Sequence, residues 1–151
     1  MRVLNDRDEI AKAVGEELGV SEWMEISQDR IDQFADATGD RQWIHVDPER
    51  AVDGPFGKTV AHGYLTLALL PFLGAQVFAF AGNVARVNYG LDKVRFMSPV
   101  TVGSKVRDRV VLSDVRDIEK GQQATLRHTV EIKGNDRPAC VAETIVLLMA
   151  A

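Results

Sequence analysis

An acid and a base stand close together in the segment that runs from Thr38 to His45. Asp40 and His45 are five residues apart, and the large apolar residues Trp43 and Ile44 lie between them. Apolar neighbours place titratable side chains in a dry pocket, where their pKa values shift. Such a pair can take a proton from water and deliver a proton to carbon. Taken alone, the spacing favours a simpler alternative, in which His45 pairs with Asp40 only to support the local structure.

Short helices and turns are expected to hold this pair in place. Residues 29–37 carry apolar side chains at helical spacing, Ser27 is a suitable N-cap, and Gly39 is typical of a left-handed C-cap. Further on, Asp47 begins a single helical turn that has proline at its first position. Residues 53–57 are a dense cluster of turn residues, which predicts a loop that either lines a pocket or only connects two elements.

The most apolar segment, residues 60–81, is predicted to be one long buried helix. It nearly reaches the ~20 apolar residues that a membrane-spanning helix needs. His62 and Gln76 interrupt it and no basic clusters flank it, so we expect no membrane insertion. A helix that is apolar on all sides is equally expected in the core of a soluble domain. Pro71 should kink this helix, because proline removes a backbone hydrogen bond and clashes with the preceding turn.

Five segments have the pattern of β-strands: residues 22–26, 84–96, 104–115, 124–133 and 139–149. Residues 134–136 predict a hairpin turn between the last two strands. A strand, several helices and then an antiparallel run of strands indicate an α+β domain with its helices on one face of the sheet. The length suits one domain over residues 1–151, with a helical extension at residues 1–20 that packs on the domain or on a partner.

The composition is that of an ordinary soluble globular protein. The chain is 46% hydrophobic and 26% charged, and its formal net charge of −4 argues against binding of nucleic acid. Residues 1–53 carry 14 acidic and 6 basic side chains, whereas residues 86–109 carry 6 basic and 2 acidic ones. This basic stretch could meet an anionic ligand such as a phosphate group, but a solvated strand face explains most of its residues equally well.

Other kinds of chemistry find little support in the sequence. Cys140 is the only cysteine and lies in an apolar strand, so we expect a buried structural thiol and no intrachain disulfide. The N-terminus lacks a basic region followed by an apolar core, so we expect no secretion signal and a reducing, cytoplasmic location. The three histidines are not spaced as metal ligands, and the nucleophile-elbow, dinucleotide and P-loop motifs do not occur.

Three stretches of the chain, in order and in spacing, resemble the landmarks of a known family. They are Gly39-Asp40 with Ile44-His45 and Ala51, then Ala61-His62-Gly63-Tyr64-Leu65, and finally the stretch from Asn88 to Val100. The first resembles the hydratase signature of the MaoC-like (R)-specific enoyl-CoA hydratases. The third is most similar to the nodulation-protein-N-like branch of that family. The resemblance covers roughly residues 20–150 and implies a hot-dog fold, in which an antiparallel sheet wraps around a long central helix.

The resemblance also implies roles for particular residues. It makes Asp40 and His45 the catalytic acid–base pair, and it makes the N–H of Gly63 the donor to the thioester oxygen. Gln42 stands where the family usually has an asparagine that helps to hold the substrate or the water. Asn88 is a further candidate for substrate binding, although it could equally cap a bulge.

Several other positions are expected to be structural or to depart from the family pattern. His62 is expected to be structural, because the family assigns its chemistry to the other histidine. His128 lies on the apolar side of its predicted strand, where a hydrogen-bonded core histidine is the default. Trp43 replaces the proline of the family, and Pro71 stands where some members carry a serine. Together with Gln42, these departures leave room for a subunit without catalytic activity.

The resemblance therefore implies an enzyme that hydrates trans-2-enoyl-CoA to (R)-3-hydroxyacyl-CoA. It implies no cofactor and no metal, because water, an acid and a base suffice for the reaction. It also implies a homodimer, and chain-length preference would depend on a tunnel that Trp43, Phe56 or Tyr64 could line. Two alternatives remain open: a hot-dog acyl-CoA thioesterase, and a non-catalytic subunit that binds acyl-CoA or a partner.

Overall fold

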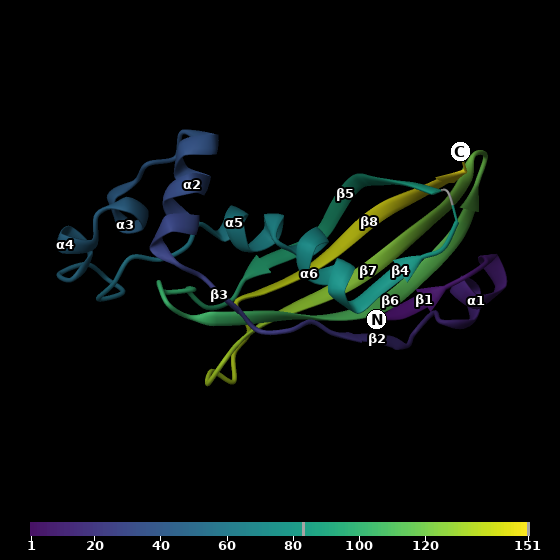
Figure 1. Ribbon diagram of the computed structural model, residues 1–151, viewed down its shortest axis with the longest axis horizontal. Coiled ribbons are helices and arrows are strands. Elements are labelled where there is room, and N and C mark those ends of the chain that lie inside the picture. The colour runs from purple at the N-terminus through teal and green to yellow at the C-terminus, as the bar shows by residue number, and fades with distance from the viewer. Residues whose placement is uncertain (83, 151) are drawn as a thin grey trace.

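One curved antiparallel sheet dominates the computed structural model, which describes residues 1–82 and 84–150 (Figure 1). Its long strands are β5 (Val84–Phe96), β6 (Lys105–Ile118), β7 (Gly121–Ile132) and β8 (Cys140–Ala150), in the order β6-β7-β8-β5. Two short strands, β2 (Glu17–Val20) and β3 (Met24–Glu25), pair with the outer side of β6. The predicted α+β fold class with an antiparallel sheet is therefore confirmed.

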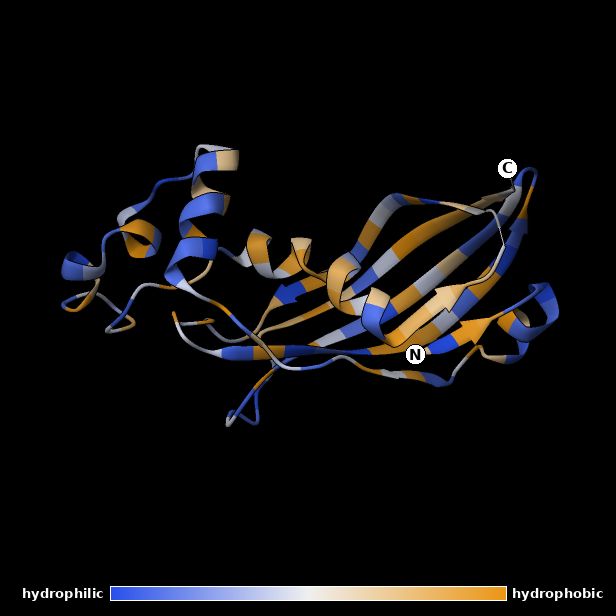
Figure 2. Ribbon diagram, viewed as in Figure 1, coloured by the Kyte–Doolittle hydropathy of each residue, from blue (hydrophilic) through white to orange (hydrophobic). Residues whose placement is uncertain are grey.

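The alternation of side chains along the strands decides which of them face the helices. In β6 and β7 alternate residues are buried, as the pattern of residues 124–133 predicted, and the colours of Figure 2 change accordingly along these strands. Strand β5 has the outermost position and pairs only with β8. Its other edge is therefore unpaired within the part of the chain that the structure describes.

The long helix predicted for residues 60–81 is wrong in its extent. The structure has two successive helices, α5 (Gly63–Ala68) and α6 (Leu70–Val77), which meet at Leu69. The break lies just before Pro71, so proline occupies the first turn of α6, where its missing N–H leaves no helical hydrogen bond unmade. The helices cover one face of the sheet, but two of their aromatic side chains are exposed, Tyr64 and Phe72. The helical segment is therefore not buried on all sides.

The helical extension predicted for residues 1–20 is helical only in part, and a short strand lies at each end of it. Only α1 (Arg7–Lys12) is helical. Strand β1 (Arg2–Leu4) precedes it and pairs in parallel with β4 (Phe78–Phe80), the segment that directly follows α6. Side chains from both segments share one buried core cluster, which also includes residues of β6, β7 and β8. The N-terminal segment therefore packs on its own sheet.

The remaining helices gather at one end of the molecule, at the left of Figure 1. They are α2 (Gln28–Thr38), α3 (Trp43–Val46) and α4 (Pro48–Ala51). The Ser27 side chain caps α2, Gly39 ends it with a left-handed φ of 79°, and Asp47 caps α4, all as predicted. No helix among the described residues is long and apolar enough to cross a membrane.

A tight connection between β6 and β7, which the sequence analysis did not predict, makes Gly121 irreplaceable. Its φ is +145°, and an added Cβ would overlap the carbonyl oxygen of Leu148. We expect Gly121→Ala to lower the free energy of unfolding by more than ~3 kcal/mol, since backbone strain and overpacking add together. Gly134→Ala is the control, because Gly134 also has a positive φ of +80° but has open space around it. That change should cost only about 1 kcal/mol. Urea denaturation measures both values, and equal losses would contradict the steric argument.

Candidate active site

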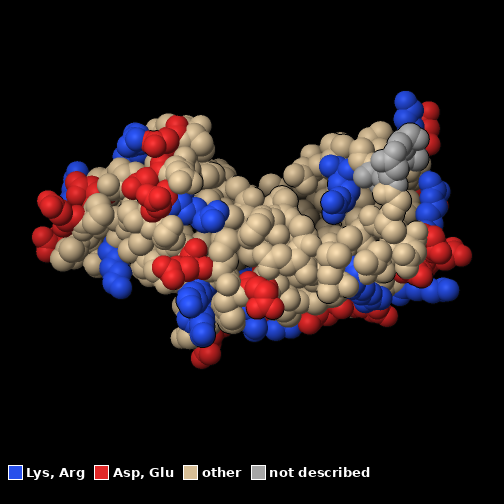
Figure 3. Space-filling view, viewed as in Figure 1, with Lys and Arg blue, Asp and Glu red and all other residues tan. Residues whose placement is uncertain are grey.

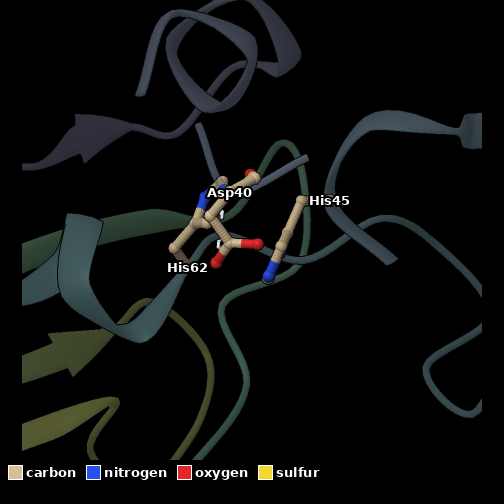
Figure 4. Close-up of side chains that lie close together, drawn as sticks. All are labelled: Asp40, His45 and His62. Atoms are coloured by element: carbon tan, nitrogen blue, oxygen red, sulfur yellow. Dashed lines mark hydrogen bonds and ion pairs between the residues drawn. The ribbon is translucent and has the colours of Figure 1, made fainter. Parts of the chain in front are cut away.

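Three segments bring Asp40, His45 and His62 together at the helical end of the molecule. Asp40 directly follows the C-cap of α2, His45 lies in α3, and His62 is the residue before α5. One possible ligand atom from each side chain lies within 4.8 Å of the others (Figure 4). The predicted acid–base pair is therefore close in space, and a second histidine joins it.

A backbone carbonyl fixes the orientation and the tautomer of His45. The side chain is buried, and its Nδ1 lies 2.6 Å from the carbonyl oxygen of Val60. Because a carbonyl can only accept a hydrogen bond, Nδ1 carries the proton and Nε2 of the neutral ring keeps its lone pair. Burial lowers the pKa of His45 below its ordinary value of 6.5, and the nearby His62 lowers it further. The Val60 hydrogen bond and the charge of Asp40 oppose this shift. His45 is thus held as a neutral imidazole, a form that can accept a proton.

His62, which the sequence analysis expected to be structural, lies inside the cluster. It is buried, and its Nε2 donates a hydrogen bond to the backbone oxygen of Asp40 over 2.8 Å. Its ring stacks on His45 with the centroids 3.7 Å apart, and Phe34 packs against it at 4.9 Å. His62 therefore fixes the backbone of one predicted catalytic residue and the ring of the other. The only sequence signal for this was its position beside Gly63.

The Asp40 side chain is the exposed member of the cluster. Its relative exposure is 53%, against 2% for His62. Oδ2 lies 4.0 Å from Nε2 of His62, and Oδ1 accepts a long hydrogen bond of 3.4 Å from the backbone N–H of Gln42. The carboxylate is therefore reachable from solvent while the two rings behind it are not. Gln42 is also exposed and contacts Asp40 through its backbone rather than through its amide.

Gly63 is the first residue of α5, where backbone N–H groups have no partner within the helix. A Cβ at this position would lie only 3.0 Å from the ring of Phe96, so glycine is also required for close packing. Gly63 and Phe96 line an apolar hollow of about 250 Å³, together with Ile44, Phe56 and Val60. An open N–H group thus borders an apolar space that adjoins the segments carrying the cluster.

Asn88 is not brought to this cluster within one chain. It lies eight residues before Phe96 on β5, which separates them by roughly 26 Å along an extended strand. Asn88 instead borders a different cavity, which also contains His128.

The loop of residues 53–57 lines the apolar hollow through Phe56. Trp43 packs against Gly54 of the same loop and lies under the guanidinium of Arg50.

Three of the six basic side chains in residues 86–109 form ion pairs with carboxylates. Arg107 and Arg109 both bind Glu131, at 2.6 and 2.9 Å, and these ion pairs lower the pKa of Glu131 against the opposing effect of burial. Lys93 lies 3.3 Å from Glu143. These three cations therefore belong to the solvated strand face that was the alternative to a phosphate site.

The cluster is poorly shaped for a metal ion, although it offers three possible ligand atoms. The rings of His45 and His62 are nearly parallel, with an angle of 22° between their planes, so their lone pairs point along separate planes. Zinc needs lone pairs that converge on one point at about 2.1 Å. The arrangement suits proton transfer better than metal binding.

Comparison with known proteins identifies close relatives of this chain. The family described as "MaoC like domain" matches residues 9–133. The 3-hydroxyacyl-thioester dehydratase Z of Mycobacterium tuberculosis is 53% identical over 151 residues, which is 99% of this chain and 100% of the relative. Nodulation protein N of Rhizobium leguminosarum bv. viciae is 47% identical, over 93% of this chain and 89% of the relative. These matches confirm the predicted family and its branch.

A solved structure confirms the hot-dog fold. The (R)-hydratase from A. caviae involved in PHA biosynthesis superposes with a TM-score of 0.74 and is 26% identical in sequence. The match covers 89% of this chain and 96% of that structure.

The three-residue cluster predicts how substitutions at Asp40 and His62 shift the pKa of His45. We expect its imidazole to titrate below 6.5. Asp40→Asn should lower this pKa further, because it removes a negative charge that favours the imidazolium. His62→Phe should raise it, because the variant keeps an aromatic ring in the stack but removes a group that disfavours the charge. The ring proton shifts followed by NMR against pH report each value. Shifts of the opposite sign would show that the cluster does not set this pKa.

Proposed function

Because the chain belongs to the MaoC-like dehydratase family, we propose that it catalyses the addition of water to trans-2-enoyl-CoA, giving (R)-3-hydroxyacyl-CoA, and the reverse dehydration. The observation that carries the proposal is the neutral imidazole of His45, with its free Nε2 beside the accessible carboxylate of Asp40. Two neighbouring acceptors of this kind are what one water molecule with two O–H donors requires. The (R) configuration rests on similarity to the hydratase branch of the family.

In the proposed reaction, one water supplies both the hydroxyl group at C3 and the proton at C2 of the product. Asp40 and His45 each accept a hydrogen bond from this water, which turns a lone pair of its oxygen toward C3 of the substrate. A C–O bond forms at C3, the pair takes the released proton, and the same proton is then delivered to C2. The carbon–carbon double bond becomes a single bond, and no oxidant, reductant or metal takes part. The pair acts as a unit, because the proton that it takes from water is the proton that it delivers to C2.

The start of α5 has a proposed role in stabilising the negative charge that develops on the thioester oxygen. The N–H of Gly63 lies at the positive end of a helix and lacks a helical partner, so it can donate to that oxygen. The hollow beside Gly63 is mostly apolar, and an apolar surrounding strengthens such a hydrogen bond. Gln42 remains a candidate for holding the water from the solvent side.

The enzyme is proposed to act as a homodimer that pairs through β5. A strand edge with unpaired backbone groups is a template for another strand. Large apolar side chains on β5 and the neighbouring helices are exposed: Tyr64, Phe72, Val87, Tyr89 and Leu91. Figure 3 shows a wide hollow with few charged side chains between the helical end and the far end of the sheet. A second copy would cover these side chains and complete the sheet edge.

A cytoplasmic location is part of the proposal. The single Cys140 is buried and free, and burial raises the pKa of its thiol to about 11, with the charge of Asp108 as a further cause. Such a thiol is inert and fits a structural role in a reducing compartment.

Replacing either member of the pair should abolish most of the activity. We expect Asp40→Asn and His45→Gln each to lower the rate of crotonyl-CoA hydration at least ~100-fold, because each removes an acceptor for the water. The loss of enoyl-thioester absorbance measures hydration, and a thiol reagent runs in parallel. Asp53→Asn is the matched control, since Asp53 is an exposed carboxylate in the loop that follows.

The same assay separates the alternatives. Release of free thiol would identify a thioesterase. Tight acyl-CoA binding with no turnover at any chain length would identify a non-catalytic subunit. If Asp53→Asn lowers the hydration rate as much as Asp40→Asn does, the loss reflects a general effect on charge or folding rather than the acid–base pair.

The pH dependence of the reaction should follow from the lowered pKa of His45. The ring must be neutral to accept a proton, and burial keeps it neutral down to a pH below 6.5. The acid limb of kcat/KM should therefore be centred below pH 6.5. An acid limb centred above pH 6.5 would contradict the assignment of His45 as the neutral acceptor.

A further inference from the structure

A row of polar side chains crosses the sheet on the face that the helices cover. The row begins with Asp108 on β6, His128 on β7 and Thr144 on β8. Each of these residues lies two positions along the strand from the residue that pairs directly with its neighbour in the row. Asn88 on β5 continues the row, since it pairs with Val146, two residues beyond Thr144. Diagonal neighbours on one face of a sheet lie within reach of each other's side chains. The row therefore runs from the buried interior to the exposed edge strand.

Hydrogen bonds join the inner part of this row. His128 Nδ1 lies 2.7 Å from Oδ2 of Asp108, and His128 Nε2 lies 3.1 Å from Oγ1 of Thr144. Asp108 is fully buried and His128 nearly so. Burial raises the pKa of the Asp108 carboxyl, and the hydrogen bond and charge of His128 oppose that rise. A titratable pair thus sits in the interior, far from the proposed acid–base pair.

This row is an expensive way to build a core. The second oxygen of Asp108, Oδ1, is buried and has no hydrogen-bond partner among the described residues. A partly satisfied polar network is less stable than apolar side chains of the same size. Two of the row's flanking neighbours on the same face, Val130 and Leu126, show that apolar residues fit there. Stability alone does not account for the polar residues.

The row borders a cavity of about 260 Å³ between the sheet and α6. Its walls are mostly apolar, including Leu70, Phe78 and Val146, whereas His128 and Thr144 supply polar groups. Asn88 and Arg86 lie where the cavity reaches the edge strand β5. The shape and chemistry suit an apolar chain that carries one hydrogen-bonding group.

The hydroxyl of Thr144 indicates which hydrogen-bonding group would fit. If His128 is neutral, its Nε2 accepts a hydrogen bond from the hydroxyl of Thr144, and the Thr144 oxygen can then accept a hydrogen bond from a ligand. If His128 is charged, Nε2 donates to Thr144, whose proton is then free for a ligand. A ligand hydroxyl can pair in both cases, because it both donates and accepts. A carbonyl oxygen can pair only in the second.

Pairing of two copies would bring this cavity to the proposed active site. Within one chain, the cavity adjoins the first half of β5, whereas Gly63 packs on Phe96 at its end. Antiparallel pairing of two β5 edges about a two-fold axis sets the first half of one strand beside the second half of the other. The tail of a substrate that reacts in one protomer is thereby directed toward the cavity of its partner.

With the acyl chain of the proposed substrate in this cavity, we propose that the natural substrate carries a hydroxyl group on that chain, held by Thr144 in front of His128 and by Asn88 at the mouth. The inference rests on the proposed hydratase function and on the homodimer. It names the substrate class as hydroxylated acyl thioesters, beyond the reacting double bond that the proposed activity requires.

Five substrates test this inference: trans-2-octenoyl-CoA, and its four derivatives with a single hydroxyl on C5, C6, C7 or C8. Crotonyl-CoA, whose chain ends at C4, reports the hydratase activity by itself. We expect at least one hydroxylated substrate to exceed octenoyl-CoA about tenfold in kcat/KM, as one buried hydrogen bond can provide. If the kcat/KM for octenoyl-CoA equals or exceeds the values for all four hydroxylated substrates, the inference fails while the hydratase function stands. If no substrate is hydrated, both fail.

Variants of one position separate recognition from structure. Thr144→Val keeps the shape and removes the hydroxyl, so the preference ratio should fall to about one, whereas Thr144→Ser should retain it. Thr129→Val is the matched control, because Thr129 lies on the neighbouring strand β7 but on the opposite face. An unchanged ratio in Thr144→Val overturns the inference. A merely structural role would lower the melting temperature and the rates on all substrates equally.

Mixed dimers test whether the cavity serves the partner's reaction. A dimer of one Asp40→Asn chain and one Thr144→Val chain, purified through two different tags, has one intact acid–base pair. If the cavity lies across the interface, that pair faces the intact cavity of the other chain, and the hydroxyl preference should return. If the preference stays at about one, pair and cavity belong to the same chain, and the proposed path is wrong.

Discussion

The hydrogen bond from His45 Nδ1 to the carbonyl of Val60 joins the two segments on which the site depends. One segment is the short helix α3, and the other is the extended stretch that leads into α5. A second bond of the same kind, from His62 Nε2 to the carbonyl of Asp40, runs in the opposite direction between the same segments. Each histidine therefore anchors the chain that carries the other. Together the two bonds fix which nitrogen of each ring bears the proton, and this makes His45 an acceptor.

Stacking and burial complete this arrangement at a cost. The two rings lie 3.7 Å apart with almost no solvent around them, so protonation of His45 would place a charge in a poorly solvated site. The exposed carboxylate of Asp40 lies beside them and partly offsets this effect on His45. A neutral ring next to an accessible carboxylate follows from this balance. The proposed chemistry uses the balance, since both groups face the same water.

The edge strand β5 imposes a second constraint on the molecule. It carries exposed apolar side chains and a backbone edge that no strand of the described residues pairs with, while the acid–base cluster and the polar row lie toward opposite ends of it. A single chain thus holds two chemically distinct regions that it cannot bring together by itself. Antiparallel pairing of two β5 edges, about a two-fold axis perpendicular to the strands, would join them, so assembly and specificity would depend on the same strand.

Local sequence determined much of the local structure. The caps at Ser27, Gly39 and Asp47 follow from side-chain hydrogen bonds and from the left-handed freedom of glycine, which act within a few residues. The strand from 124 to 133 follows from strict alternation of polar and apolar side chains. Similarity of spacing was enough to connect Asp40, His45 and Gly63 with a family. None of these inferences needed to know what lies across the fold.

Tertiary contacts decided the rest. The apolar run of residues 60–81 has no periodicity that marks its end, and β1 pairs with residues 78–80 to make them a strand. His62 lies next to Gly63 in sequence, but only the packing of α2 and α3 against the start of α5 places its ring on His45. The row from Asp108 to Asn88 combines residues from four strands, so no short segment of sequence displays it. Sequence thus determined features that depend on near neighbours, and the tertiary structure decided those that depend on register and on contacts between distant segments.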